Sequence, residues 1–467
     1  MRCIFLNIGL TGVLTPAGVL VAFSVSLAGQ GVSVDDPFHS SVPAAQASGE
    51  PLALSLDDAI GRALKSNLGV LVRANQTSTA RVDRLRALSA LLPSVSAGFT
   101  ETSEQISLAS YGFHFPGTPA INGPFGFQDL RANADTKIFD LSLRRNLKAT
   151  AERAHAAALS EQDARDLVVE AVASGYFTIL AGTARADALN VDVGVAEMLY
   201  QIARDRHAAG VTPAIDELRA KVEWQTQQQR LLGQQNQVAK DKLALARVIG
   251  LAPGQDYRLT DQAPFAPLEG LSSDDLLRKA LASRADYRSA QSQVRAAELT
   301  RQAADAARYP SLSFSGAYGD IGPTLASSHG TYSAIGSVKL YLFDGRIRAE
   351  QEATSVEIKQ RREELESLKG RIDFEVRSAL LDLKTASDQM AVARDRLDLA
   401  TQTLDQARDR FRAGVTGNIE VVEAQEAVST ATQSLISSEY AHNLGKAALA
   451  RAVGTTEASL KQFMGSK

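Results

Sequence analysis

The second half of this 467-residue chain repeats the first half. The segment from Asp57 to Ser94 aligns without gaps with the segment from Asp274 to Ser311, at a constant offset of 217 positions. A second block aligns at an offset of 204 positions. It pairs Phe139-Asp140 with Phe343-Asp344, Ala203–Arg206 with Ala407–Arg410, Ala209–Thr212 with Ala413–Thr416, and Ala244–Arg247 with Ala448–Arg451. Repeated matches at one offset indicate an internal duplication, so both halves must fold on one plan.

The duplication predicts a first repeat over residues 50–250, a second over 260–455, and a tail over 456–467. Each half is expected to begin with short helical structure, a single short helix in the first half and short helices in the second, and to continue through two strands into a very long helix. A Gly-Val-Thr turn and a returning helix follow, with Gly250 and Gly454 at the helix ends. The expected strands are about 93–102, 128–139, 310–319 and 331–343. The expected long helices are about 141–208, 213–250, 345–411 and 417–454.

The long helices carry heptad patterns. In the second half one line of large side chains and one line of alanines each recur every seven residues. The large line is Leu383, Met390, Leu397, Leu404 and Phe411, and the alanine line is Ala379, Ala386, Ala393, Ala400 and Ala407. This spacing is typical of coiled coils, and alanine lets a neighbouring helix approach closely. A helix over 345–411 would be roughly 100 Å long. An ordinary cytoplasmic coiled coil is the alternative.

The expected strands alternate weakly between apolar and small or polar residues over about ten positions, which is typical of transmembrane β-strands. Long and short loops are expected between them, at about 103–127 and 320–330. Four strands cannot close a barrel, and open sheet edges are not tolerated in lipid, so the barrel would have to be shared between chains. The alternative is a small soluble sheet packed on a helical core.

The N-terminus has the pattern of a secretory signal. Arg2 is followed by a mostly apolar stretch, and Ala28 ends an acceptable cleavage site, which predicts a signal peptide over 1–28, with Ala47 as a second candidate. A membrane-anchoring helix is the alternative, although its glycines and Pro16 disfavour it. No other stretch is expected to cross a bilayer as a helix. The single cysteine, Cys3, excludes intramolecular disulfides and cysteine-based zinc sites.

Catalysis and nucleic-acid binding are not indicated. The net charge is −3, so no basic surface for nucleic acid is expected. The six histidines are scattered without a His-Glu-x-x-His pair, and no phosphate-binding loop is found. Acidic pairs such as Asp57-Asp58 and Asp274-Asp275 recur at expected helix starts, where they favour the helix dipole. We therefore expect no enzyme activity, no cofactor and no bound metal. A hydrolytic envelope enzyme would need a catalytic group that the sequence does not reveal.

Over residues 50–455 the sequence resembles the TolC-like outer-membrane channel family. The resemblance rests on the duplication, the paired strands, and the segment Arg410–Thr416 followed by Glu423-Ala424-Gln425. It implies a mainly helical fold with strands: a homotrimer in outer-membrane lipid, with a 12-stranded β-barrel and a long α-helical coiled-coil barrel crossing the periplasm. It also implies a passive exit duct, of a tripartite efflux pump or of a type I secretion system. A periplasmic adaptor and an inner-membrane transporter of RND or ABC type would be its partners.

The resemblance also implies two sites at the periplasmic entrance. The helical turns, which would dock the adaptor, comprise Gly210, Val211, Thr212, Gly414, Val415 and Thr416. Acidic residues near the turns would ring the lumen at the gate; they are Glu420, Glu423 and Asp216. The alternative for these acids is a solvated helix face. His207 is expected to be a packed or partly exposed interface residue. Because Cys3 cannot be acylated, the chain is expected to be a non-acylated member. The runner-up function is a soluble or periplasmic coiled-coil scaffold with a small sheet.

Overall fold

The computed structural model describes residues 37–456, with gaps at 44–46, 48–49, 114–115, 118, 120, 262–269, 271, 414 and 417. The predicted signal peptide and residues 457–467 of the predicted tail lie outside this described part. Eight helices run through the described residues. They are α1 (Leu56–Ser66), α2 (Leu68–Ser89), α3 (Leu141–Ala208), α4 (Ala214–Ile249), α5 (Ser273–Ser283), α6 (Ala285–Ala306), α7 (Gly345–Arg412) and α8 (Asn418–Val453).

The duplication is visible in the helix lengths. Both α3 and α7 have 68 residues, and both α4 and α8 have 36. Asp140 and Asp344 cap α3 and α7 by accepting hydrogen bonds from backbone N–H groups of the first turn. At the other ends of the hairpins, Gly250 and Gly454 have left-handed φ values of 69° and 76°, so the predicted glycine helix ends are confirmed.

The short helices are broken at the same place in each half. Asn67 separates α1 from α2 and Arg284 separates α5 from α6, both in extended backbone. Ser66 Oγ donates to Ile249 O at 3.1 Å, and its counterpart Ser283 Oγ donates to Val453 O at 2.6 Å. The single short helix predicted for the first half is therefore wrong. At this break the Ser66 hydroxyl provides a donor for a carbonyl at the end of α4.

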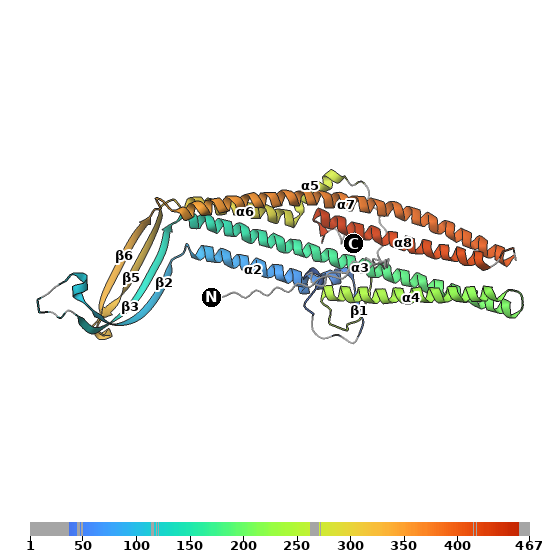
Figure 1. The fold of residues 1–467 in the computed structure, drawn as a ribbon, viewed down its shortest axis with the longest axis horizontal. Helices are drawn as coiled ribbons and strands as arrows, with labels where there is room; N and C mark the ends of the chain where they lie inside the picture. The colour runs from blue at the N-terminus through green and yellow to red at the C-terminus, as the bar shows by residue number, and fades with distance from the viewer. Residues whose placement is uncertain are drawn as a thin grey trace, which may run out of the picture. The chain divides into compact units, whose positions relative to one another are not determined.

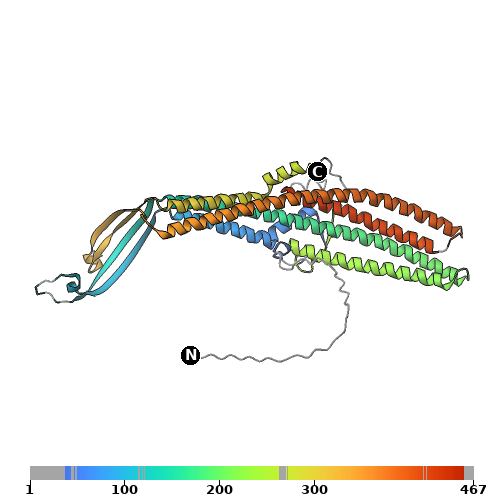
Figure 2. The same ribbon diagram turned by 45° about the horizontal axis from the view of Figure 1, so that its top comes forward.

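The long helices pack side by side (Figures 1 and 2). Helix α3 contacts α2, α4, α6 and α8, and α7 contacts α6 and α8. The predicted heptad seam of α7 is confirmed: its buried members are Leu383, Met390, Leu404, Ala379, Ala386, Ala393 and Ala407. Alanines at these positions allow the neighbouring backbones to approach closely, so the seam joins α7 to α8 along most of their shared length.

A four-stranded antiparallel sheet occupies the end of this unit opposite the two helical turns (Figure 1). Its order is β2-β3-β5-β6, so β3 and β5 join the two halves while β2 and β6 are edges. The strands are β2 (Ser94–Ile106), β3 (Asn122–Phe139), β5 (Ser311–Gly322) and β6 (His329–Lys339). Both faces are open in a single chain, because Val95 on one face is 77% exposed and Ile335 on the other is 56% exposed.

Several strand bounds differ from the prediction. Strand β2 ends at Ile106 and β3 begins at Asn122, so the predicted loop over 103–127 is wrong at both ends. Polar residues there obscure the alternation, yet the ladder continues through the pair Ser103–Gly126. In the second half β5 continues to Gly322, and β6 ends at Lys339 and not near 343.

A small parallel pair was not predicted. Strand β1 (Leu52–Leu54) pairs with β4 (Tyr257–Leu259) beside the largest apolar core of the helical region. The Tyr176 hydroxyl of α3 lies 3.1 Å from both Leu54 O and Asp261 Oδ2, and its single proton is shared between these two acceptors. Burial of this side chain raises the pKa of Tyr176 to about 12. Three-residue strands are too short to show a period in the sequence.

Helix α3 contains one 18-residue window that is long and apolar enough, by composition, to cross a membrane. The expectation that the signal region alone has this property is therefore wrong. Half of that window is buried within the protein, including Val168, Val172 and Tyr176 of the core. The apolar composition of this stretch is accounted for by the core in which Val168, Val172 and Tyr176 pack with residues of α1, α4 and α8.

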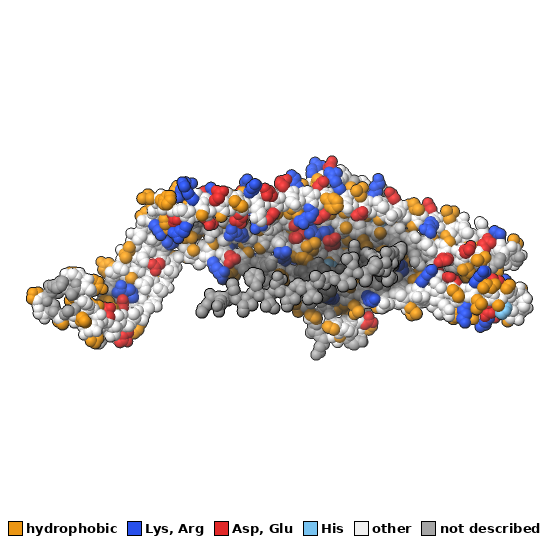
Figure 3. All heavy atoms as spheres, in the orientation of Figure 1, with side chains coloured by type: hydrophobic (Ala, Val, Ile, Leu, Met, Phe, Trp, Pro, Cys, Tyr) orange, Lys and Arg blue, Asp and Glu red, His pale blue; other side chains and the backbone are white. Residues whose placement is uncertain are grey.

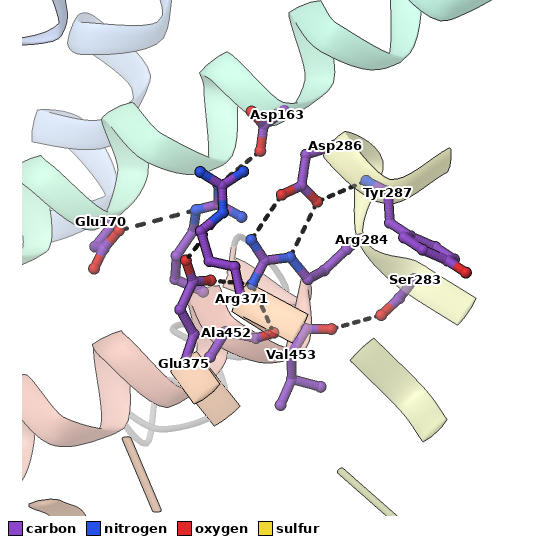
Figure 4. Close-up of polar contacts among 11 residues, drawn as sticks. Asp163, Glu170, Ser283, Arg284, Asp286, Tyr287, Arg371, Glu375, Ala452 and Val453 are labelled. Atoms are coloured by element: carbon purple, nitrogen blue, oxygen red, sulfur yellow. Dashed lines mark hydrogen bonds and ion pairs between the residues drawn. The ribbon is translucent and has the colours of Figure 1, made fainter. Parts of the chain in front are cut away.

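A cluster of charged side chains connects the middle of α3 and of α7 with the start of α6 and the end of α8 (Figure 4). Arg284 is 2% exposed; its guanidinium binds Asp286, Glu375 and the carbonyl oxygen of Ala452. Burial alone would raise the pKa of Asp286, but the hydrogen bonds and charge of Arg284 lower it below its usual range.

A second arginine of this cluster, Arg451, pairs with Asp163 at 2.6 Å and approaches Glu170 at 4.0 Å. Burial raises the pKa values of these two carboxyls even though Arg451 opposes the shift. The network therefore links both repeats through two arginine side chains that are only 3% and 12% exposed.

We expect His442 of α8 to make stability depend on pH. It is 1% exposed, and burial, with a smaller contribution from nearby Lys446, lowers its pKa from 6.5 to about 4. In the unfolded chain His442 would bind a proton near pH 6.5, so the stability that the buried, neutral side chain contributes is fully present above pH 6.5. It is lost as pH falls toward 4, by about 1.4 kcal/mol per pH unit. His442→Gln should lose less thermal stability than the parent between pH 7 and pH 5, measured by circular dichroism. Equal losses in the two proteins would contradict this assignment.

Candidate functional site: the two helical turns

The first turn joins α3 to α4 at the end of the unit opposite the sheet (Figure 1). The N–H of Gly210 donates to His207 O and the N–H of Val211 donates to Arg206 O, both at 2.9 Å. These two bonds form a Schellman motif, which requires the left-handed backbone that Gly210 supplies at φ 72°. A Cβ at Gly210 would meet no atom within 4 Å, and Val211 is 71% exposed. The turn thus presents its outer surface to solvent.

The second turn, between α7 and α8, follows the same backbone plan. The N–H of Val415 donates to Arg410 O at 3.0 Å, which matches the Val211 bond in the first turn. Val415 is 68% exposed. Gly414, one of the residues predicted to dock a partner, lies outside the described residues. The hydroxyls of Thr212 and Thr416 are buried at equivalent places, and neither has a hydrogen-bond partner in the described structure.

The predicted acidic residues lie just beyond the turns, and two of the three hold ion pairs. Glu420 pairs with Arg410 at 3.0 Å across the second turn, and Asp216 approaches Arg219 at 4.0 Å on α4. Glu423 is exposed, and no ion pair to it is found among the described residues. Arg410 therefore neutralises part of the charge that was predicted to face a lumen.

The two turns differ in the chemistry of one equivalent pair. In the first turn His207 Nδ1 and Glu217 Oε2 lie 2.6 Å apart, whereas the second turn has Phe411 and Val421 at the matching positions. His207 is thus partly exposed and engaged with a carboxylate, consistent with its prediction as an interface residue. The sequence contained the signal for this difference, since the substitution interrupts an otherwise matching block.

An arginine of the first turn packs on the second. The Arg206 guanidinium lies over the Phe411 ring, 4.2 Å from its centroid. Arg206 is the counterpart of Arg410, which pairs with Glu420 within its own turn. A small apolar cluster continues this contact; it comprises Leu404, Ala407, Val421 and Ala424, with Leu199, Phe411 and Val428 against it. The two turns are therefore held together by a cation–π contact and an apolar cluster.

An apolar groove runs between α4 and α8 beside the turns. It is lined by Ile215, Leu218, Val222, Ile419 and Val422, with Asp216, Arg219 and Glu223 at its rim, and has a volume of about 390 Å³. Figure 3 shows apolar, basic and acidic side chains intermingled at this end. The groove leaves no local pattern in the sequence, because its two walls come from different repeats. Among the described residues, no three His, Cys, Asp or Glu side chains are grouped to hold a metal ion.

Comparison with known proteins finds relatives that match most of the chain. The model of the outer membrane efflux protein family matches residues 59–251 and 276–455, one segment in each half. TtgC, a toluene efflux pump outer membrane protein of Pseudomonas putida, is 24% identical over 415 residues, covering 86% of this chain and 83% of TtgC. TtgF of the same species, also a toluene efflux pump outer membrane protein, is 26% identical over 395 residues, covering 80% and 78%. The crystal structure of the outer membrane protein VceC from Vibrio cholerae superposes with a TM-score of 0.74 at 18% identity, covering 85% of this chain and 96% of VceC.

Proposed function

Because this chain belongs to the outer membrane efflux protein family and is an outer-membrane channel, we propose that three copies form the exit duct of a tripartite efflux pump. The proposal rests chiefly on the family match, which covers both repeats and thus the whole helical and stranded framework. The names of TtgC and TtgF, both toluene efflux pump proteins, support efflux over type I secretion. The duct would be a passive conduit without catalytic activity.

The edges of the sheet support the trimer. Strands β2 and β6 have no neighbour on their outer sides in a single chain. Unpaired backbone groups are costly in lipid, so β2 of one copy must pair with β6 of the next. Three copies would contribute twelve strands to one closed barrel. The exposed side chains of the sheet, including Val95 and Tyr332, would then face outer-membrane lipid or neighbouring chains.

Membrane fractionation tests this assembly against the runner-up, a periplasmic or soluble coiled-coil scaffold. The duct predicts that the protein is found in outer-membrane fractions and migrates as a trimer that dissociates on heating. A protein found wholly in the soluble fraction would rule out the duct.

Within the duct we propose residues 50–250 and 260–455 as the two structural repeats, each contributing two strands and one helical hairpin.

At the other end, the turns would dock the tip of a periplasmic adaptor that connects to an inner-membrane transporter of RND or ABC type. The exposed side chains of Val211 and Val415 and the apolar groove beside them support this proposal. They form an apolar surface with a charged rim, which is the composition expected of an interface between proteins. The gate of the duct would lie in the same region.

The acidic residues of the second turn are expected to make the pore prefer cations. Replacing Glu420 and Glu423 together by Gln removes two carboxylates per chain, so six per trimer, and should reduce cation over anion permeability in planar bilayers. Glu423 should account for more of the change, since Arg410 already pairs with Glu420. Asp83→Asn, on an exposed residue of α2, provides the matched control. An unchanged reversal potential would show that these carboxylates do not line the pore.

A further inference from the structure

An exposed apolar segment lies where the sheet meets the long helices (Figure 1). Strand β6 ends at Lys339, and the next four residues, Leu340-Tyr341-Leu342-Phe343, lead to α7; we call them the junction segment. Leu342 is 92% exposed and Phe343 is 85% exposed, the two highest values among the large hydrophobic side chains of the described residues. Such a run is rarely left in water, so it indicates a partner outside the chain.

The two faces of the sheet differ in polarity. One face carries Val95, Phe99, Leu130, Tyr318 and Tyr332. The opposite face carries Ser96, Asp129, Arg131, Asn133, Asp135 and Thr331. A closed barrel turns its apolar face to lipid and its polar face to the lumen. The face with Tyr332 is therefore the one that a barrel would turn to lipid, and we call it the lipid face.

The apolar character of the lipid face continues into the junction. Val338 lies on this face together with Tyr332, because side chains alternate along β6. Phe139, at the end of β3, pairs with Leu312, and Leu312 pairs with Val338, so the Phe139 ring lies on this face too. Phe343 of the junction segment is the counterpart of Phe139 in the second repeat. Both repeats therefore have an aromatic ring where the sheet gives way to the helices.

Basic side chains begin directly beyond these rings. Near the start of α3 they are Arg144 and Lys148, and near the start of α7 they are Arg346 and Arg348, all of them exposed. Neither helix has an acidic residue in its first turn, whereas α1, α4, α5, α6 and α8 each have at least one. Cations near a helix N-terminus oppose the helix dipole, so helix stability does not account for this arrangement.

Three of these four cations have no carboxylate partner. Arg346 pairs with Asp344 at 3.1 Å. For Arg144, Lys148 and Arg348, no ion pair is found within the part of the chain that the structure describes. Their N–H donors are therefore available to an anion that comes from outside the chain.

The position of Arg144 connects these donors to the apolar surface. Its guanidinium lies over the Phe139 ring, 5.4 Å from the centroid, and is thereby held beside the lipid face. The helix end itself is not the site, since Asp140 already accepts a hydrogen bond from the N–H of Leu143 at 3.0 Å. The available donors are those of the side chains, next to exposed apolar groups.

We propose that this junction binds anionic phospholipids of the periplasmic leaflet, an inference that rests on the duct proposed above. The junction segment and Phe139 contact the acyl chains, while Arg144, Lys148 and Arg348 bind the phosphate and the negatively charged headgroup. Guanidinium and ammonium groups beside exposed apolar side chains match a ligand that carries phosphate next to hydrocarbon.

A neighbouring copy is the alternative occupant of the junction segment. The next copy of a trimer would pair with β6 through backbone groups along the edge of the strand. Edge pairing leaves the side chains of the lipid face uncovered, because they point away from the plane of the sheet. The basic side chains also require an anion, which a phospholipid supplies together with the hydrocarbon.

Binding of two lipids with identical acyl chains tests the proposal. The full chain is purified in detergent, stripped of lipid and titrated with dioleoylphosphatidylglycerol or dioleoylphosphatidylcholine, and lipids bound to the trimer are counted by native mass spectrometry. Phosphatidylglycerol should bind at least about fivefold more tightly, because one Lys or Arg near an anionic lipid surface accounts for about that factor. The preference should fall as salt is added. Displacement of the lipid by sodium phosphate at matched ionic strength would overturn lipid as the ligand.

Arg144→Gln with Lys148→Gln should keep the trimer and lose most of the preference for phosphatidylglycerol. Lys221→Gln with Lys240→Gln provides the matched control, because it removes the same charge from exposed positions of α4, away from the junction. The control should bind both lipids as the parent does. Equal binding of phosphatidylglycerol by the parent and the α3 variant would overturn the proposal.

Leu342→Ser with Phe343→Ser tests the apolar half of the site. This variant should bind both lipids more weakly by a similar factor, because it removes contacts with acyl chains and not with headgroups. Loss of the trimer with lipid binding retained would show that the junction segment packs on the next copy, and would overturn its assignment to lipid. A parent trimer that binds both lipids equally would overturn this inference and leave the duct in place, whereas a chain that never forms a trimer would contradict the duct itself.

Discussion

Asp in place of Gly210 or Gly414 should abolish export while leaving the trimer intact. An Asp side chain adopts the left-handed backbone of Gly210 at a cost of about 1–2 kcal/mol. A Cβ at Gly210 would meet no atom within 4 Å, so the hairpin should still form. The new carboxylate instead points outward at the surface proposed to dock the adaptor. An unmatched charge there costs several kcal/mol, and the trimer carries it at three turns. Export is measured as dye accumulation in cells that depend on this chain.

Gly61→Asp is the matched control, because Gly61 also lies at the surface and a Cβ there would meet no atom within 4 Å. It adds the same charge to α1, far along the chain from either turn. The control should keep both trimers and export. If the turn variants export normally while their trimers persist, the turns do not dock the partner. If their trimers are lost, the surface of the turn is needed for assembly and not for docking.

Removing Arg284 should have the largest effect on stability. Arg284→Ala leaves Asp286, which is 16% exposed, without its paired cation, whereas Glu375 is 38% exposed and keeps Arg371 at 3.9 Å (Figure 4). It also removes the donor to Ala452 O near the end of α8. Breaking a buried ion pair by deleting one partner costs about 3–5 kcal/mol, because the remaining charge stays buried. We expect a lower midpoint for loss of the helical circular dichroism signal on heating, at matched protein concentration.

Arg278 offers the comparison for this stability effect. It pairs with Asp275 on α5, but its side chain is 79% exposed, so Arg278→Ala should cost at most about 1 kcal/mol. The pKa of Asp286 should also rise in Arg284→Ala, since the guanidinium that lowers it is gone. Acid should therefore destabilise that variant less steeply than the parent, as its carboxyls accept protons at higher pH. Similar melting of the two arginine variants would show that the buried network contributes little.

The framework of the fold was predictable because it rests on periodic signals. The duplication, the heptad seam of α7 and the glycine helix ends each repeat along the chain, and the predicted resemblance to TolC-like channels is confirmed. The break at Asn67 and the pairing of β1 with β4 depend on single contacts with distant segments, such as Ser66 with Ile249. A sequence period cannot report such contacts.

The candidate site at the two helical turns was predicted only in part. The positions of the turns followed from Gly-Val-Thr, but the partners of the acidic residues did not. Whether Glu420 faces a pore or binds Arg410 depends on the side-chain rotamers on the two sides of a hairpin. The groove is formed by two helices that come from different repeats. The placement of Arg206 on Phe411 also crosses the repeats. Such contacts are set by packing between hairpins, which leaves no local pattern.

The difference between the two turns has a consequence for any assembly that surrounds a threefold axis. Six turns would then alternate around the rim between a histidine–carboxylate pair and a Phe411–Val421 pair. A partner that offers six identical binding segments would meet two unlike surfaces, one polar and one apolar. The six segments would bind with two different affinities. A partner with only three segments could occupy one kind of turn and leave the other kind free.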